Sequence, residues 1–121
     1  MRVPVVAAVA AGGSAGALGR WGIGSLLDSG PVSTLVVNLS GCLLIGVLVA
    51  LVDERSPLRP LLGTGVLGGY TTFSGYAVDV HQLVSDGRPL VAAAYLTGTV
   101  AGALAAVWLG LRLGAVGTRP R

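Results

Sequence analysis

The stretch that decides the fold runs from Gly63 to Tyr76 and reads GTGVLGGYTTFSGY. It lies within a long apolar segment, yet it holds five glycines and four Ser or Thr hydroxyls, which are poor material for an unbroken helix. Inside a bilayer, unwound backbone persists only where protein or an aqueous cavity satisfies its polar groups. Broken membrane helices often place freed carbonyls on a cation and helix amino ends near an anion. The stretch therefore has two interpretations: a broken helix that forms an ion site, or a continuous helix with a glycine-rich packing face.

The composition of the whole chain is that of a membrane protein. Of its 121 residues, 53% are hydrophobic and only 11% are charged, whereas soluble domains carry roughly a quarter charged residues. The 20 glycines, set among Ala, Val and Leu, suit helices that pack closely in lipid. All 8 basic residues are arginines and none form a cluster interleaved with aromatics, so we expect membrane lipid and no nucleic acid as a partner.

The apolar runs give the number of spans. A bilayer core of about 30 Å needs roughly 20 helical residues. Short polar segments that combine charge with Gly or Pro separate the runs, at residues 28–31, 53–57 and 85–89. We predict a single four-span membrane domain over residues 1–121, with spans at 3–27, 32–52, 59–84 and 89–112. The fold class is an all-α membrane protein whose third helix is broken near its middle.

Polar residues inside the spans mark candidate functional positions. Thr34 and Asn38 are four residues apart on the second span, and Tyr95 and Thr99 repeat that spacing on the fourth. Asn in hydrocarbon is costly unless it is hydrogen-bonded, so Asn38 either joins two helices or faces water. Arg20 follows a small-residue seam of the first span, where it either extends to the interface or lines a vestibule that attracts anions.

Enzyme functions fail on inspection of the residues. Gly63 to Gly69 lacks the Lys-Ser/Thr of a phosphate loop, and the glycines near Gly12 lack the strand–helix context of a dinucleotide site. His81 is the only histidine, so this chain alone forms no catalytic triad or zinc cluster. We expect His81 in a solvated loop, Asp79 at the end of the third span and Cys42 as a small buried apolar residue. We predict that the protein is not an enzyme.

Three segments carry a resemblance to a known family. They are GGSAGALGRW at 12–21, TLVVNLSG at 34–41 and GGYTTFS at 68–74. In these segments, their order, their spacing and the four-span plan, the chain resembles the CrcB/Fluc fluoride channels. The third segment is highly specific, whereas the first alone is weak.

The resemblance implies a dimer of antiparallel subunits with two fluoride pores. It implies passive efflux that lowers cytoplasmic fluoride, and a structural Na⁺ at the dimer centre that is not transported. The main-chain carbonyls that match the sodium ligands belong to Gly68 and Thr71. The matching pore residues are Asn38, Phe73 and Thr99, and Arg20 matches an arginine at the end of the first helix.

The chemistry of fluoride agrees with these residue types. Fluoride is small and strongly hydrated, so a narrow pore must supply replacement donors. Suitable groups are the Asn38 amide, the positive edge of the Phe73 ring and the hydroxyls of Thr34, Ser74 and Thr99. Each site must also bind weakly enough for the ion to leave. We find neither a nucleotide motif nor a run of buried carboxylates, so a passive channel fits better than a pump.

Two positions depart from the family pattern. Tyr76 stands where a second phenylalanine is usual, and Ala103 stands where the fourth helix often carries serine. Tyr76 keeps a ring edge on the fluoride path but adds a hydroxyl. Ala103 removes one hydroxyl from the row of polar side chains on the fourth helix. Either change implies an impaired pore or a partner that supplies the missing group.

Two rival functions stay open at this point. A small antiparallel multidrug exporter needs an acid embedded in the membrane for proton coupling. We expect none of the acidic residues in mid-span; they are Asp28, Asp53, Glu54, Asp79 and Asp86. The other rival is a non-transporting membrane assembly subunit whose glycines serve packing alone.

The arginines also predict orientation. Four spans put both termini and the loop after the second span on one side, with Arg2, Arg55, Arg59, Arg112, Arg119 and Arg121. The other side has at most Arg20 and Arg88. Because positive residues near span ends favour the cytoplasm, we expect cytoplasmic termini in a multi-pass plasma-membrane protein. A chain that inserts both ways should be nearly balanced, so the bias favours a second, related chain as the antiparallel partner over a homodimer.

Overall fold

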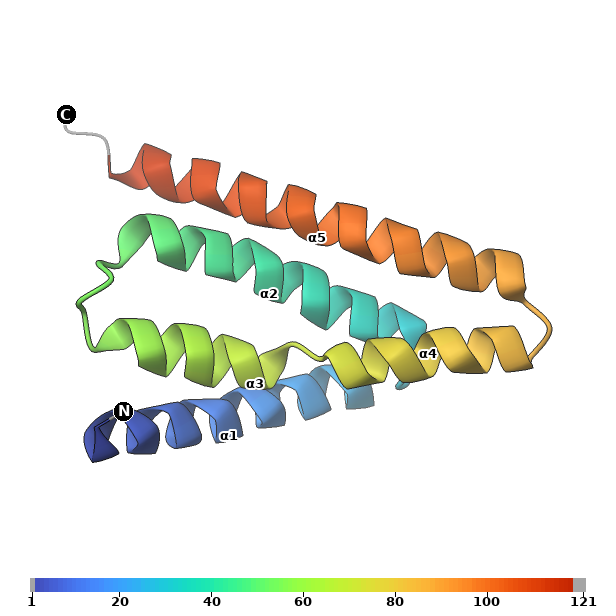
Figure 1. Ribbon diagram of the computed structural model, residues 1–121, viewed down its shortest axis with the longest axis horizontal. Helices are drawn as coiled ribbons and strands as arrows, with labels where there is room; N and C mark the ends of the chain where they lie inside the picture. The colour runs from blue at the N-terminus through green and yellow to red at the C-terminus, as the bar shows by residue number, and fades with distance from the viewer. Residues whose placement is uncertain (1, 119–121) are drawn as a thin grey trace.

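The computed structural model describes residues 2–118, and in that part every regular element is helical (Figure 1). The elements are α1 (Val3–Leu26), α2 (Pro31–Leu51), η1 (Arg59–Leu67), α3 (Gly68–Tyr70), α4 (Phe73–Ser85) and α5 (Pro89–Gly117). η1 is a π-helix that continues into α3, and the pair is followed by α4. Four helical rods result, and the third is interrupted, so the all-α prediction is confirmed.

Glycines set how closely the rods approach one another. α1 packs on η1 through Gly12 and Gly16, where an added Cβ would collide with the backbone of the other helix. Gly65 and Gly69 present the matching surface of the η1–α3 segment. Because small residues let helix backbones touch, this contact replaces the large side chains of a soluble core. The small-residue seam predicted on the first span therefore packs against the glycines of the η1–α3 segment.

A second glycine contact joins α2 to α5, which run in the same direction. Gly46 lies against Gly110, and Gly114 lies against the backbone and side chains near Ala50. Residue numbers rise together along this contact, so the two helices are parallel neighbours, as Figure 1 shows. This pair has the most extensive contact in the described part of the chain.

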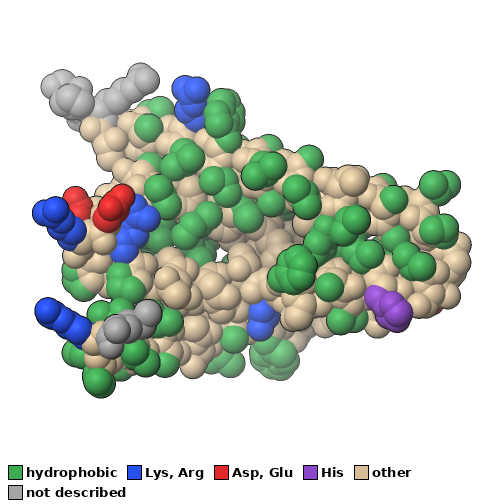
Figure 2. All heavy atoms as spheres, in the orientation of Figure 1, with side chains coloured by type: hydrophobic (Ala, Val, Ile, Leu, Met, Phe, Trp, Pro, Cys, Tyr) green, Lys and Arg blue, Asp and Glu red, His purple; other side chains and the backbone are tan. Residues whose placement is uncertain are grey.

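Three of the rods are long and apolar enough to cross a membrane: α1, α2 and α5. The third rod is divided between η1–α3 and α4, and each half is too short to cross alone. Leu and Val side chains are exposed along the rods, and hydrophobic side chains cover much of the face in Figure 2. Such a surface suits contact with lipid, and the chain is a membrane protein by the length and composition of its helices.

The two ends of the bundle differ in charge. The start of α1, the connection between α2 and η1, and the end of α5 lie at one end (Figure 1). Basic side chains gather at that end in Figure 2. Arg59 lies there and donates to the carbonyls of Val52 and Val49, at 3.0 and 3.3 Å, which satisfies the end of α2. Arg119 and Arg121 lie outside the described residues.

Candidate functional site

The helix break lies between Tyr70 and Phe73. Thr71 and Thr72 have extended backbone, with ψ angles of 158° and 123°. In a continuous helix the N–H of Thr72 would bond the carbonyl of Gly68. It donates instead to Asn38 Oδ1 at 2.8 Å. The interpretation of a broken helix is therefore right, and that of a continuous packing helix is wrong.

Asn38 braces the break from α2. Its Nδ2 donates to the carbonyl of Thr72 at 2.9 Å, while its Oδ1 accepts from the N–H of the same residue. The carboxamide thus gives Thr72 the donor and the acceptor that a neighbouring peptide would supply in regular structure. Gly41, one turn further along α2, leaves room for the Thr71 side chain. Asn38 joins two helices, and it does so at the break itself.

Arg20 holds the other freed carbonyl. The N–H of Gly75 would bond the Thr71 carbonyl in a continuous helix, but it donates to Thr72 Oγ1 at 3.0 Å. The Thr71 carbonyl accepts instead from Arg20 Nη1 at 3.0 Å. Arg20 is half-buried within α1, so it neither ends the helix nor extends freely to the interface. Its guanidinium is fixed beside the break.

The predicted sodium ligands, Gly68 and Thr71, lie on the first half of the broken rod. The carbonyl of Gly68 loses its usual donor to Asn38, and Gly68 itself is exposed. Freed main-chain carbonyls are suitable ligands for a hard cation. Among the described residues no cluster of His, Cys, Asp or Glu could hold a metal ion instead. The role of both carbonyls stays a prediction, and Thr71 would share its carbonyl with the Arg20 guanidinium.

A cavity of about 520 Å³ opens beside the start of α4. Its lining includes Arg20, Thr34, Ser74 and Asp79. The first N–H groups of α4 have no acceptor within the helix, and the helix dipole makes this end positive. Together with the Arg20 guanidinium, the amino end of α4 makes its side of the cavity favourable to an anion, whereas the Asp79 carboxylate on the same lining opposes one.

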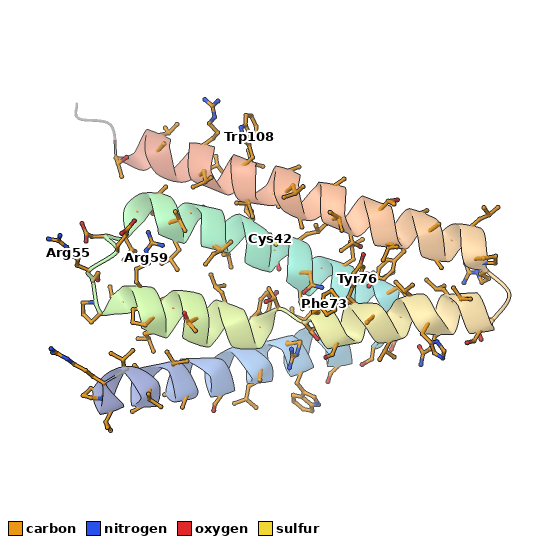
Figure 3. All side chains as sticks on the ribbon, in the orientation of Figure 1. Cys42, Arg55, Arg59, Phe73, Tyr76 and Trp108 are labelled. Atoms are coloured by element: carbon orange, nitrogen blue, oxygen red, sulfur yellow. The ribbon has the colours of Figure 1, made fainter. Side chains whose placement is uncertain are left out.

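Aromatic side chains follow the break on α4, and Figure 3 labels Phe73 and Tyr76 there. Their ring centroids are 5.9 Å apart, and the Tyr76 ring lies 5.4 Å from that of Tyr95 on α5. Phe73 is 80% exposed, whereas Tyr76 is buried. The added hydroxyl of Tyr76 donates to the carbonyl of Leu96 at 2.6 Å. That hydroxyl is therefore committed to α5.

Thr99 and Thr34 are both buried in the bundle. The Oγ1 of Thr99 has no hydrogen-bond partner among residues 2–118. A buried hydroxyl without a partner is unusual and calls for an explanation, for example an ion or water that it would bind. Ser74 lies near Thr72, with their hydroxyl oxygens 3.3 Å apart. The structure thus places Thr34 and Ser74 at the cavity and Thr99 outside its lining, buried in the bundle.

Asp79 is the residue that sequence reasoning placed wrongly. α4 continues six residues beyond it to Ser85, and its carboxylate is buried and accepts from the Tyr95 hydroxyl at 3.0 Å. His81 lies on the same helix, exposed but not in a loop. Asp79 is therefore buried within the third rod, but it lies six residues from the end of that rod and away from its middle at the break, so the expectation of no acid in mid-span stands. Tyr76, Asp79 and Leu83 are spaced as one face of a helix that continues past Asp79; this spacing is the signal that was missed, and the structure buries all three.

Comparison with known proteins gives one consistent family. Residues 7–111 match the family described as CrcB-like protein, Camphor Resistance (CrcB). The chain is 46% identical over 116 residues to "Fluoride-specific ion channel FluC 1" of Streptomyces coelicolor, covering 89% of this chain and 75% of that protein. It is 44% identical over 112 residues to "Fluoride-specific ion channel FluC" of Paracoccus denitrificans, covering 88% of this chain and 90% of that protein.

Proposed function

This chain belongs to the CrcB-like protein family, and we propose that it is a fluoride-specific ion channel. It is not an enzyme. The observation that carries the proposal is the braced helix break, which sets the positive amino end of α4 and the Arg20 guanidinium beside a cavity. The two relatives are matched over 75% and 90% of their own length, and both are named as fluoride-specific ion channels.

The path of the ion follows from the donors that the bundle offers. Fluoride enters the cavity towards Arg20 and the start of α4, where Ser74 and Thr34 offer hydroxyls. Beyond the cavity, the buried, unpartnered hydroxyl of Thr99 and, on the outer side of α4, the ring edge of Phe73 would replace the hydration shell. Asn38 already gives one N–H to Thr72, so only its second amide hydrogen is left for the ion. Its main contribution is to hold the break open.

A second subunit completes the path in this proposal. Phe73 is 80% exposed in the single chain, so an ion beside its ring would face lipid on the other side. An antiparallel subunit that covers Phe73 and Gly68 would enclose the ion. The arginine bias between the two ends favours a second, related chain in that position. The same bias would place the termini on the cytoplasmic side of the plasma membrane.

A structural sodium ion at the centre of such a dimer is supported by the freed carbonyl of Gly68. Two subunits would present Gly68 and Thr71 carbonyls in duplicate, and a bound cation would neutralise these dipoles where the breaks meet. Arg20 already donates to Thr71, so Gly68 would be the stronger ligand of each pair.

Fluoride efflux from liposomes tests the proposed function. Purified protein is reconstituted in vesicles loaded with fluoride, and efflux is followed with a fluoride electrode. Vesicles loaded with chloride are the selectivity control. We expect fast fluoride efflux without an added proton gradient, and little chloride efflux. Efflux that requires a proton gradient would favour an exporter built around Asp79, and no flux of either ion would favour an assembly subunit.

A further inference from the structure

The outer face of α5 carries one charged residue in an otherwise apolar surface. Arg112 is the only charged residue among the 29 residues of this helix, and its side chain is exposed. Leu104, Trp108 and Val116 lie four or eight residues from it along the same helix face and are also exposed. α5 packs on α2 through Gly110 and Gly114, which are buried. The Arg112 guanidinium is therefore on a lipid-facing surface, where α5 itself supplies no carboxylate.

The guanidinium is held over an aromatic ring and does not extend to the end of the helix. Its carbon lies 5.0 Å from the centroid of the Trp108 ring, one turn back towards the middle of α5. Trp108 points away from the bundle in Figure 3. A cation–π contact of this kind fixes the orientation of the guanidinium plane but leaves its N–H edge free. The pair thus presents a fixed row of donors next to apolar surface.

We propose that Trp108 and Arg112 form a binding site for the phosphate of an anionic phospholipid. A charge on a lipid-facing helix is costly unless an opposite charge meets it, and Arg112 lies only five residues before the end of α5, where lipid phosphate is the anion expected. Guanidinium binds phosphate through two parallel hydrogen bonds, and the indole of a tryptophan prefers the headgroup level. The acyl chains would lie on Leu104 and its apolar neighbours. This end of the bundle is also the basic end, which attracts anionic lipid.

The proposal rests on the chain spanning a membrane and not on which ion it conducts. Tryptophan fluorescence tests it, because the chain has 2 tryptophans and the Trp21→Phe variant leaves Trp108 as the sole reporter. This protein is placed in mixed vesicles that contain either brominated phosphatidylglycerol or equally brominated phosphatidylcholine. We expect half-maximal quenching at about fivefold less brominated phosphatidylglycerol than phosphatidylcholine.

Two further variants separate a specific site from general attraction. Arg112→Gln should abolish the preference for phosphatidylglycerol, whereas Arg55→Gln, with the same loss of charge at the same end, should keep it. If Arg112→Gln cannot be purified, Arg112→Lys should weaken the preference, because an ammonium neither stacks flat nor binds phosphate through two bonds. Equal quenching by both lipids, or equal loss in Arg55→Gln, would overturn the site. Absence of quenching by either lipid would also overturn it, because a protein partner would then cover this face.

Discussion

Asn38 makes hydrogen bonds from both ends of its carboxamide to the backbone of a single residue, Thr72. The two residues belong to different rods, α2 and the interrupted third rod. A helix break leaves backbone donors and acceptors without partners, which hydrocarbon cannot supply. One amide side chain therefore makes the break compatible with a membrane. Asn38, which the sequence predicted on the ion path, supports the backbone of the helix break.

Replacing Asn38 with alanine should destabilise the fold as well as stop conduction. The N–H and the carbonyl of Thr72 would both lose their partner, and each of these part-buried groups would cost at most about 1–3 kcal/mol, the value for a fully buried one. We expect a lower midpoint of thermal unfolding in detergent together with strongly reduced fluoride efflux. Ser14→Ala is the matched control, because that exposed hydroxyl bonds only to Ala10 in its own helix. Wild-type stability in Asn38→Ala would contradict the support role.

Replacing Phe73 with isoleucine should reduce fluoride efflux while leaving the fold intact. Phe73 is 80% exposed in the single chain, so its removal leaves no cavity inside the bundle, but the ring edge is lost. We expect unchanged helical content of the chain by circular dichroism and a large loss of efflux rate. Leu104→Ile, an exposed apolar change on α5, should leave both unchanged. Normal efflux in Phe73→Ile would remove the ring from the ion path.

Sodium should stabilise the protein without crossing the membrane. Thermal unfolding is measured in sodium chloride and in the chloride of a bulky organic cation at equal ionic strength. We expect a higher midpoint in sodium, because free carbonyls such as that of Gly68 gain a ligand. Tracer sodium should stay inside liposomes that release fluoride. Identical melting in the two salts would argue against a structural ion.

Glycine contacts between helices should be intolerant of a single methyl group. An added Cβ at Gly46 would collide with the backbone of α5, so Gly46→Ala should lower stability by about 1–3 kcal/mol. Gly98 is the matched control, because an added Cβ there meets nothing within 4 Å. Gly98→Ala should be neutral or raise stability by about 0.5–1 kcal/mol, since alanine loses less chain entropy in a helix. Equal effects at the two positions would contradict the packing argument.

The chain should insert with one dominant orientation. Single cysteines replace Ser85 and Thr118, at opposite ends of the bundle, in a Cys42→Ser background. Each is labelled in intact cells with a membrane-impermeant reagent. We expect labelling at position 85 and protection at 118, because basic span ends stay in the cytoplasm. Equal labelling at both positions, together with flux from the single purified chain, would contradict the two-chain arrangement.

The helix break was one of two interpretations that the sequence left open. The glycines and hydroxyls from Gly63 to Tyr76 indicated a weak helix, yet Gly63, Gly65, Gly68 and Gly69 remain helical and the break falls at Thr71 and Thr72. The rods follow from the length of the apolar runs. The partners of the break were not predictable, because Asn38 and Arg20 reach it from other helices. Asp79 was misplaced for a related reason. A charge was taken to end the span, whereas the Tyr95 hydroxyl on α5 lets the carboxylate remain inside it.

The two halves of the third rod meet end to start at Thr71 and Thr72, and this arrangement reverses the local electric field. The carboxyl end of the first half carries roughly half a negative charge, and the amino end of α4 carries roughly half a positive one. Within two residues the backbone thus offers one surface to cations and another to anions. In the proposed channel, part of the selection by sign would then come from peptide dipoles beside the Arg20 guanidinium, and peptide dipoles do not titrate.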